Sequence, residues 1–129
     1  MNVKKLTPVL YVDTIERSLE FWVDRLGFKK TIEVPAGDRL GFVALERDDV
    51  ELMLQTHASA AEDVPVVAEA VARSSSALYI EVDDLDMVRG IADGSEVVVP
   101  ERTTFYGTRE IGLRSPGGHV VIFATRSDT

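Results

Sequence analysis

The feature that most constrains the fold is an internal repeat. Val12 aligns with Val82 within the similar segments Leu-Tyr-Val-Asp and Leu-Tyr-Ile-Glu-Val-Asp, an offset of 70 residues. Aligning the last hairpin turns of the two halves, at Asp49 and Gly118, gives an offset of 69 residues. Two landmarks that agree within one residue indicate a duplicated unit, and the alternative is a chance pairing of unrelated segments.

The first half is predicted to be one strand, one helix and three more strands. A helix is indicated at Ile15–Leu26 because apolar residues recur at helical spacing, and Gly27 supplies a left-handed stop. The strands are short apolar or alternating runs between turn residues. They are expected at Leu6–Val12, Phe28–Val34, Leu40–Glu46 and Val50–Gln55.

The second half repeats this order. A helix is expected at Leu85–Ala92, after Asp83 and Asp84 at the capping position. Strands are expected at Ala77–Val82, Glu96–Pro100, Phe105–Arg114 and His119–Thr125. We predict one α+β domain, residues 1–129, built from two tandem βαβββ units at 5–55 and 77–125. The segment 56–76 is predicted to be a linker with room for a short helix near Pro65.

Composition narrows the possible partners. The net charge of −8 and the pI of about 4.7 argue against nucleic acid and against anionic membranes. No apolar run reaches the length of a membrane span, and no cysteine exists for a disulfide or a thiolate zinc site. A cytoplasmic protein is the expectation. The charge would attract a cationic ligand, although solubility is the simpler explanation of the charge.

Two stretches of sequence carry a family resemblance. The opening Pro8–Thr14, with Phe21-Trp22 and Leu26-Gly27-Phe28, is one, and the closing Tyr106–His119 is the other. Together they resemble the vicinal oxygen chelate superfamily, which includes glyoxalases, bleomycin-resistance proteins and extradiol dioxygenases. The resemblance implies two curved mixed sheets around a cavity, helices on the outside, and a homodimer.

The resemblance also raises the question of a metal. Catalytic members of the superfamily hold a divalent ion with His, Glu or Gln from the first and last strand of each unit. The corresponding positions in this chain are Thr7, Met53, Ala77 and Ile122. None is a usual ligand, so we predict no metal and no cofactor. A register shift of two residues would bring Glu51 or Gln55 forward, and Glu81 and Glu110 could also point into the cavity. A carboxylate-only site for magnesium or calcium is then conceivable.

Strand alternation predicts which side chains line the cavity and bind the ligand. These residues are Thr7, Val9, Tyr11, Met53, Gln55, Tyr79, Glu81, Glu110, Arg114 and Ile122. Tyr11 and Tyr79 are expected at matching places in the two units. The set describes an apolar hollow with a few polar groups, suited to a flat or aromatic ligand. The alternative is a filled cavity with Glu110 and Arg114 as a cross-strand ion pair.

The functional prediction is therefore a small-molecule binding protein without a metal. It would sequester an aromatic or cationic compound, as the resemblance to bleomycin-resistance proteins implies. The four unsuitable ligand positions favour binding over catalysis. One alternative is a metal-dependent lyase, isomerase, dioxygenase or thiol transferase of the same superfamily. Another is a metal-independent enzyme with Glu81, Glu110 or Tyr79 as general acid or base.

Overall fold

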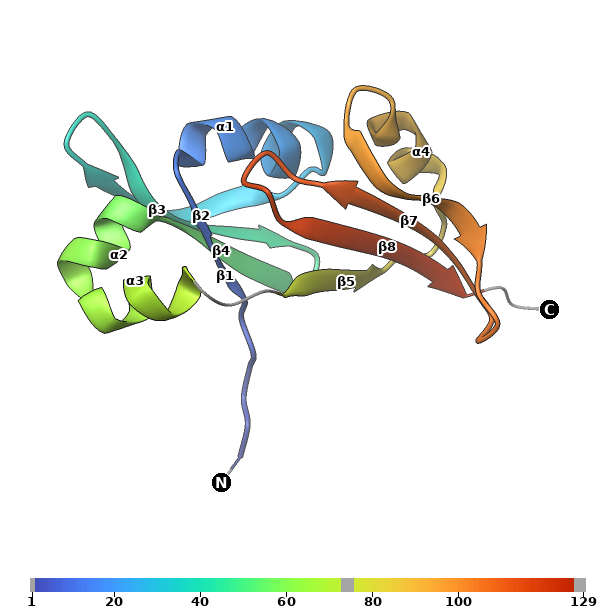
Figure 1. Cartoon of the computed structure of the whole chain (residues 1–129), viewed down its shortest axis with the longest axis horizontal. Coiled ribbons are helices and arrows are strands. Elements are labelled where there is room, and N and C mark those ends of the chain that lie inside the picture. Colours follow the sequence, from blue (N-terminus) through green and yellow to red (C-terminus); the bar gives the residue numbers. More distant parts are fainter. Residues whose placement is uncertain (1, 73–75, 127–129) are drawn as a thin grey trace. The chain divides into compact units, whose positions relative to one another are not determined.

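The computed structural model describes residues 2–72 and 76–126, which form two compact units (Figure 1). The units comprise Met1–Ser74 and Ser75–Thr129, and each contains one four-stranded sheet. Within the described part of the chain, no helix has the length and apolarity needed to cross a membrane. The two-unit α+β architecture predicted from the repeat is confirmed.

Unit 1 holds the first βαβββ motif. Its strands lie in the order β1-β4-β3-β2, with β1 parallel to β4 and the other neighbours antiparallel. The elements are β1 (Val9–Val12), α1 (Ile15–Leu19), η1 (Glu20–Arg25), β2 (Lys29–Ala36), β3 (Arg39–Arg47), β4 (Val50–Thr56), α2 (His57–Asp63) and α3 (Pro65–Val71).

The core of unit 1 lies between one sheet face and the first helix. Trp22 is 1% exposed and meets Phe21 and Phe28 edge to face, with ring centroids 5.2 and 5.4 Å apart. The strands contribute alternate side chains to this core, such as Leu52 and Leu54 of β4, while their neighbours in sequence point away. The opposite face of the sheet carries the alternate residues of β4, such as Met53 and Gln55.

The first helix differs from the prediction of one α-helix over Ile15–Leu26. It continues from α1 into the π-helix η1, in which the amide of Leu26 donates to the carbonyl of Phe21 at 3.0 Å. A π-turn is wider than an α-turn, and here it accompanies the burial of two adjacent aromatic side chains. Gly27 ends the helix with φ of 76°, as its position predicted.

Other element boundaries in unit 1 also differ from the predicted ones. The first strand begins at Val9 rather than at Leu6, whose side chain is 85% exposed. The predicted linker contains two helices, α2 and α3, instead of one short helix, and its residues 73–75 lie outside the described part. Thr56 caps α2 by accepting the amide hydrogen of Ser59 at 3.0 Å.

Unit 2 holds the second motif, with strand order β5-β8-β7-β6. The predicted strand at Phe105–Arg114 begins later, because Phe105, Tyr106 and Gly107 form the hairpin turn and Gly107 has φ of 90°. β6 also extends beyond Pro100. The elements are β5 (Ala77–Glu81), α4 (Asp86–Ala92), β6 (Glu96–Thr103), β7 (Thr108–Arg114) and β8 (Val120–Arg126).

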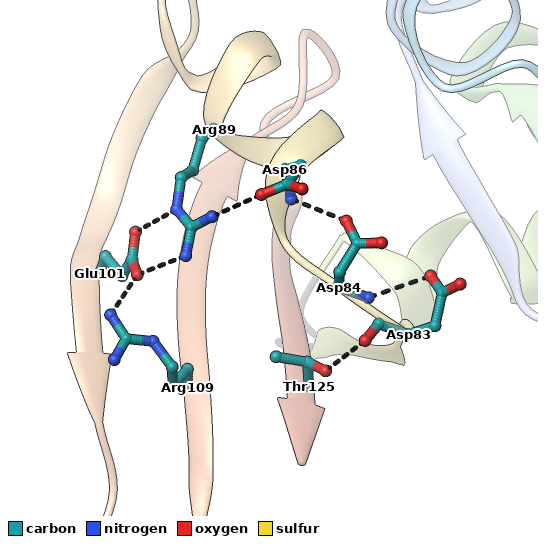
Figure 2. Close-up of polar contacts among 7 residues, drawn as sticks. All are labelled: Asp83, Asp84, Asp86, Arg89, Glu101, Arg109 and Thr125. Carbon is teal, nitrogen blue, oxygen red and sulfur yellow. Dashed lines mark hydrogen bonds and ion pairs between the residues drawn. The ribbon is translucent and has the colours of Figure 1, made fainter. Parts of the chain in front are cut away.

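An ion-pair network ties α4 to two strands (Figure 2). Arg89 of α4 donates to both carboxylate oxygens of Glu101 on β6 at 2.9 Å, and Arg109 of β7 donates to the same carboxylate at 2.6 Å. These hydrogen bonds, from Arg89 foremost, lower the pKa of Glu101 to about 2. The network lies on the face of the unit 2 sheet that packs against α4, so it takes no part in the opposite face.

Candidate functional site

The face of the unit 2 sheet opposite α4 contains a buried carboxylate, Glu110, which is 1% exposed. Its Oε2 accepts hydrogen bonds from Tyr79 at 2.8 Å, Tyr106 at 2.9 Å and Thr108 at 2.9 Å. Its Oε1 accepts one from Nη2 of Arg102 at 3.1 Å. Four donors from three strands and one turn therefore converge on a single side chain.

The strand register explains how these groups meet. Glu110 pairs with Ala124 on one side and with Arg102 on the other, and Thr108 lies two residues away on the same face. Tyr79 pairs with Ile122, so it approaches Glu110 from a neighbouring row. We call Glu110, Tyr79, Tyr106, Thr108 and Arg102 the Glu110 cluster.

The hairpin between β6 and β7 holds the cluster in place. The hydroxyls of Thr104 and Thr108 lie 2.7 Å apart, and the amide of Thr108 donates to Oγ1 of Thr104 at 3.0 Å. Both threonines are buried, at 8% and 3% exposure. Buried polar groups with satisfied hydrogen bonds rigidify their surroundings.

The protonation states of the cluster follow from this geometry. Burial alone would raise the pKa of Glu110, but the hydrogen bonds from Tyr79, Thr108, Tyr106 and Arg102 outweigh it and leave the pKa below its usual value. The pKa of Tyr79 is raised, chiefly because its hydroxyl donates to Glu110. Glu110 is therefore ionised and Tyr79 protonated at neutral pH.

Aromatic rings around the carboxylate remain accessible. Tyr79 is 50% exposed and Tyr106 is 45% exposed, although their hydroxyls are held by Glu110. Phe105 is fully exposed at the hairpin tip and meets Tyr106 edge to face, with ring centroids 5.1 Å apart. The rings of Tyr79 and Tyr106 thus form accessible aromatic surfaces, and hydrogen bonds to the buried carboxylate hold them in place.

The predicted residues of unit 1 share one face of their own sheet, because Val9 pairs with Met53 and Tyr11 pairs with Gln55. Gln55 donates to the hydroxyl of Ser59 at 3.3 Å, and the rings of Tyr11 and His57 have centroids 6.4 Å apart.

Near this face, the carboxylate of Glu51 has two partners. Lys5 Nζ lies 2.6 Å from Oε1 of Glu51, and the hydroxyl of Thr7 donates to the same oxygen at 3.3 Å. The hydrogen bond from Lys5 is the main cause of a lowered pKa at Glu51.

The donor set does not fit the divalent metal of the catalytic superfamily members. Threonine, methionine, alanine and isoleucine occupy the four corresponding positions, and two of these side chains have no donor atom. Glu51 is paired with Lys5, and Glu110 is saturated by four donors. No group of three or more His, Cys, Asp or Glu side chains that could hold a metal occurs among residues 2–72 and 76–126.

The ion pair of the filled-cavity alternative and the expectation for Tyr11 and Tyr79 are both wrong. Glu110 and Arg114 do not pair, because Arg114 lies 3.0 Å from Glu96 and Glu110 meets Arg102 instead. Tyr11 and Tyr79 do not occupy matching rows. Tyr11 pairs with Gln55 of β4, whereas Tyr79 pairs with Ile122 of β8, which corresponds to Met53 and not to Gln55.

The prediction also missed three members of the Glu110 cluster, which are Arg102, Tyr106 and Thr108. Thr108 could have been found, because it lies two residues before Glu110 on the same strand. Glu81, by contrast, lies in the same row as Glu110 but is exposed.

Unit 1 contains a separate cleft of about 420 Å³ beside the β2–β3 turn. None of the ten predicted ligand-binding residues lines this cleft. Glu16 lies in its wall and accepts the amide hydrogen of Leu40 at 2.7 Å. The lining residues are Asp13, Thr14, Glu16, Ala36, Gly37, Arg39, Leu40, Thr56, Ala58, Ser59 and Glu62.

Comparisons with known proteins agree with this architecture. Residues 5–123 match the family model of the Glyoxalase/Bleomycin resistance protein/Dioxygenase superfamily. The bleomycin-binding protein of Streptomyces verticillus, solved with copper(II)-bleomycin, is 26% identical with a TM-score of 0.64, and 99% of each chain is covered. No curated protein matches the sequence.

Two further solved structures share the fold at lower identity. TioX from Micromonospora sp. ML1 is 20% identical with a TM-score of 0.76, covering 97% of this chain and 100% of TioX. Lactoylglutathione lyase from Agrobacterium tumefaciens is 17% identical with a TM-score of 0.73, covering 97% and 95%.

Proposed function

Because the chain belongs to the Glyoxalase/Bleomycin resistance protein/Dioxygenase superfamily, we propose that it binds a small aromatic molecule without a metal. The binding site is the unit 2 sheet face around the Glu110 cluster. The observation that carries this proposal is the pair of half-exposed rings, Tyr79 and Tyr106, whose hydroxyls are fixed on a buried carboxylate. Rings held in this way lose little entropy when a flat ligand stacks on them.

Acid–base catalysis by the cluster has less support. A general acid or base works best when its pKa lies near the working pH. The shifts here run the other way, since the pKa of Glu110 is lowered and that of Tyr79 is raised. Near neutral pH, Glu110 therefore stays ionised and Tyr79 keeps its proton, which suits binding better than proton transfer.

Charge favours neutral or cationic ligands over anionic ones. The chain carries a net charge of −8, and the exposed carboxylate of Glu81 lies in the same cross-strand row as Glu110. The positive charge of Arg102 is compensated by Glu110. The similarity to the bleomycin-binding protein of Streptomyces verticillus gives further support to a sequestering role.

A thermal-shift screen of planar aromatic and aromatic cationic compounds tests the proposal. Saturation at 100 times Kd should stabilise the protein by about 2.7 kcal/mol. The stabilisation should vanish in Tyr79→Leu and Tyr106→Leu, which remove the rings. Val66→Ala, an exposed apolar residue of α3 in unit 1, serves as the control and should respond like wild type. A hit that survives both tyrosine substitutions would place binding elsewhere.

We also propose a homodimer, as the family resemblance implies. A dimer interface would cover some of the large apolar side chains that are exposed in both units, among them Leu6, Val34 and Phe105. Sedimentation equilibrium tests the proposal, and a monomer at micromolar concentration would contradict it.

A further inference from the structure

Every hydroxyl hydrogen around Glu110 is already committed. A hydroxyl group has one hydrogen to donate, and the hydroxyls of Tyr79, Tyr106 and Thr108 each donate it to Oε2 of Glu110. Because Thr108 gives its hydrogen to Glu110, the 2.7 Å contact between Thr104 and Thr108 requires Thr104 to be the donor. The hydrogens of Tyr79, Tyr106 and Thr108 therefore point toward the carboxylate, and that of Thr104 points toward Thr108.

The phenol oxygens consequently have only lone pairs left. Donation to an ionised carboxylate polarises each phenol and makes its oxygen a stronger acceptor. Turning a phenol hydrogen outward toward a ligand would remove one donor from a carboxylate that is 1% exposed, which is costly. Tyr79 and Tyr106 can thus accept hydrogen bonds from a ligand but cannot readily donate them.

Resting on the proposed function, we infer that Tyr79 and Tyr106 determine the specificity of this site by selecting aromatic ligands with an N–H or O–H donor. The rings supply the stacking surface, and the phenol oxygens accept from the ligand's phenol, amine or amide group. Methylation of that group should weaken binding. Arg102 is the one member of the cluster that retains free N–H donors, so it offers a competing site for anions.

Three naphthalene probes separate these possibilities. They are 2-naphthol, which carries a donor, 2-methoxynaphthalene, which does not, and the anion 2-naphthoate. Isothermal titration calorimetry on the wild-type chain should show 2-naphthol binding about three- to tenfold more tightly than 2-methoxynaphthalene for one added hydrogen bond. Binding of 2-naphthoate should be the weakest of the three.

Two conservative variants then locate the effect. Tyr79→Phe and Tyr106→Phe keep the rings and remove the oxygens, so each should reduce the preference for 2-naphthol. The affinity for 2-methoxynaphthalene should stay within about twofold, since stacking is retained. The comparison of probes on the wild-type chain needs no variant and stands even if one variant folds poorly.

The outcomes distinguish the inference from the proposed function. Equal binding of 2-naphthol and 2-methoxynaphthalene would leave aromatic binding intact and overturn the role of the phenol oxygens. Preference for 2-naphthoate would assign selectivity to Arg102 and also overturn it. A preference lost in Tyr11→Phe but kept in the other two variants would move the site to unit 1. No binding of either neutral probe would remove the proposed function together with the inference.

Discussion

Substitution of Glu110 by glutamine should destabilise unit 2 strongly, although it changes the side chain by little more than its charge. Glutamine has one acceptor oxygen where the carboxylate has two, so it cannot keep all four donors that Glu110 accepts. The NH2 group of glutamine is a donor, and it would face hydroxyl groups that also donate.

The magnitude follows from which donors can turn to water. Tyr79, Tyr106 and Arg102 are half exposed and recover part of their loss, whereas Thr108 is 3% exposed and cannot. A buried unsatisfied group costs about 1–3 kcal/mol, and the lost charge adds to it, which gives a total of about 2–4 kcal/mol. At roughly 3 °C per kcal/mol, the midpoint of thermal unfolding should fall by about 6–12 °C.

The assay is thermal unfolding followed by far-UV circular dichroism. Circular dichroism follows the strands of both units, whereas the single tryptophan, Trp22, lies in unit 1. Glu81→Gln is the matched control, since this acid lies in the same cross-strand row but is exposed. It should change stability by less than about 0.5 kcal/mol. Equal midpoints for the two variants would refute the reasoning.

The pH dependence provides a second check. The folded pKa of Glu110 lies below its unfolded value of about 4.3, so the unfolded state binds a proton more readily. The stabilisation by Glu110 is therefore present above about pH 4.3 and is lost as the pH falls through the folded pKa. The difference between wild type and Glu110→Gln should narrow in acid, and a constant difference would contradict the assigned charge state.

Three further predictions test the surrounding fold. Arg89→Ala should raise the pKa of Glu101 from about 2 toward its usual value, as measured by NMR titration of the carboxyl carbon. Gly27→Ala and Gly37→Ala, at positions where φ is 76° and 69°, should each lower the free energy of unfolding by about 1–2 kcal/mol, as measured by urea denaturation. The cost should be no smaller at Gly27, where a Cβ would lie 3.3 Å from a guanidinium nitrogen. Trp22→Ala should cost about 3–5 kcal/mol, because the ring is almost fully buried, and calorimetry would show the lower midpoint.

The fold was accessible from sequence because packing against helices imposes a pattern. Leu52 and Leu54 are buried while Met53 between them faces the other way, and this alternation was visible in β4. Gly27 marked the end of the first helix for a conformational reason. The family resemblance drew on the same features and is confirmed. The π-turns of η1 escaped prediction, since they change the backbone without breaking the apolar pattern.

The site was less accessible because its geometry depends on irregular backbone. Register shifts in β6 between Val97 and Val99, and between Val99 and Arg102, bring Arg102 opposite Glu110. Simple alternation cannot place a residue beyond such a shift. Tyr106 reaches the carboxylate from a hairpin turn that the sequence suggested was part of a strand.

The two copies of the motif carry different residues at equivalent places on the sheet face away from the helix. If Met53 and Ile122 are taken as equivalent, Gln55 corresponds to Ala124, and the strand register then makes Phe42 of unit 1 the counterpart of Glu110. Both copies keep apolar residues on the face that packs against a helix, because the fold requires them. The opposite face carries no such requirement, so an apolar ring and a buried carboxylate can occupy equivalent places. We therefore expect differences in ligand binding between copies of this motif to arise on the face that the folding pattern leaves unspecified.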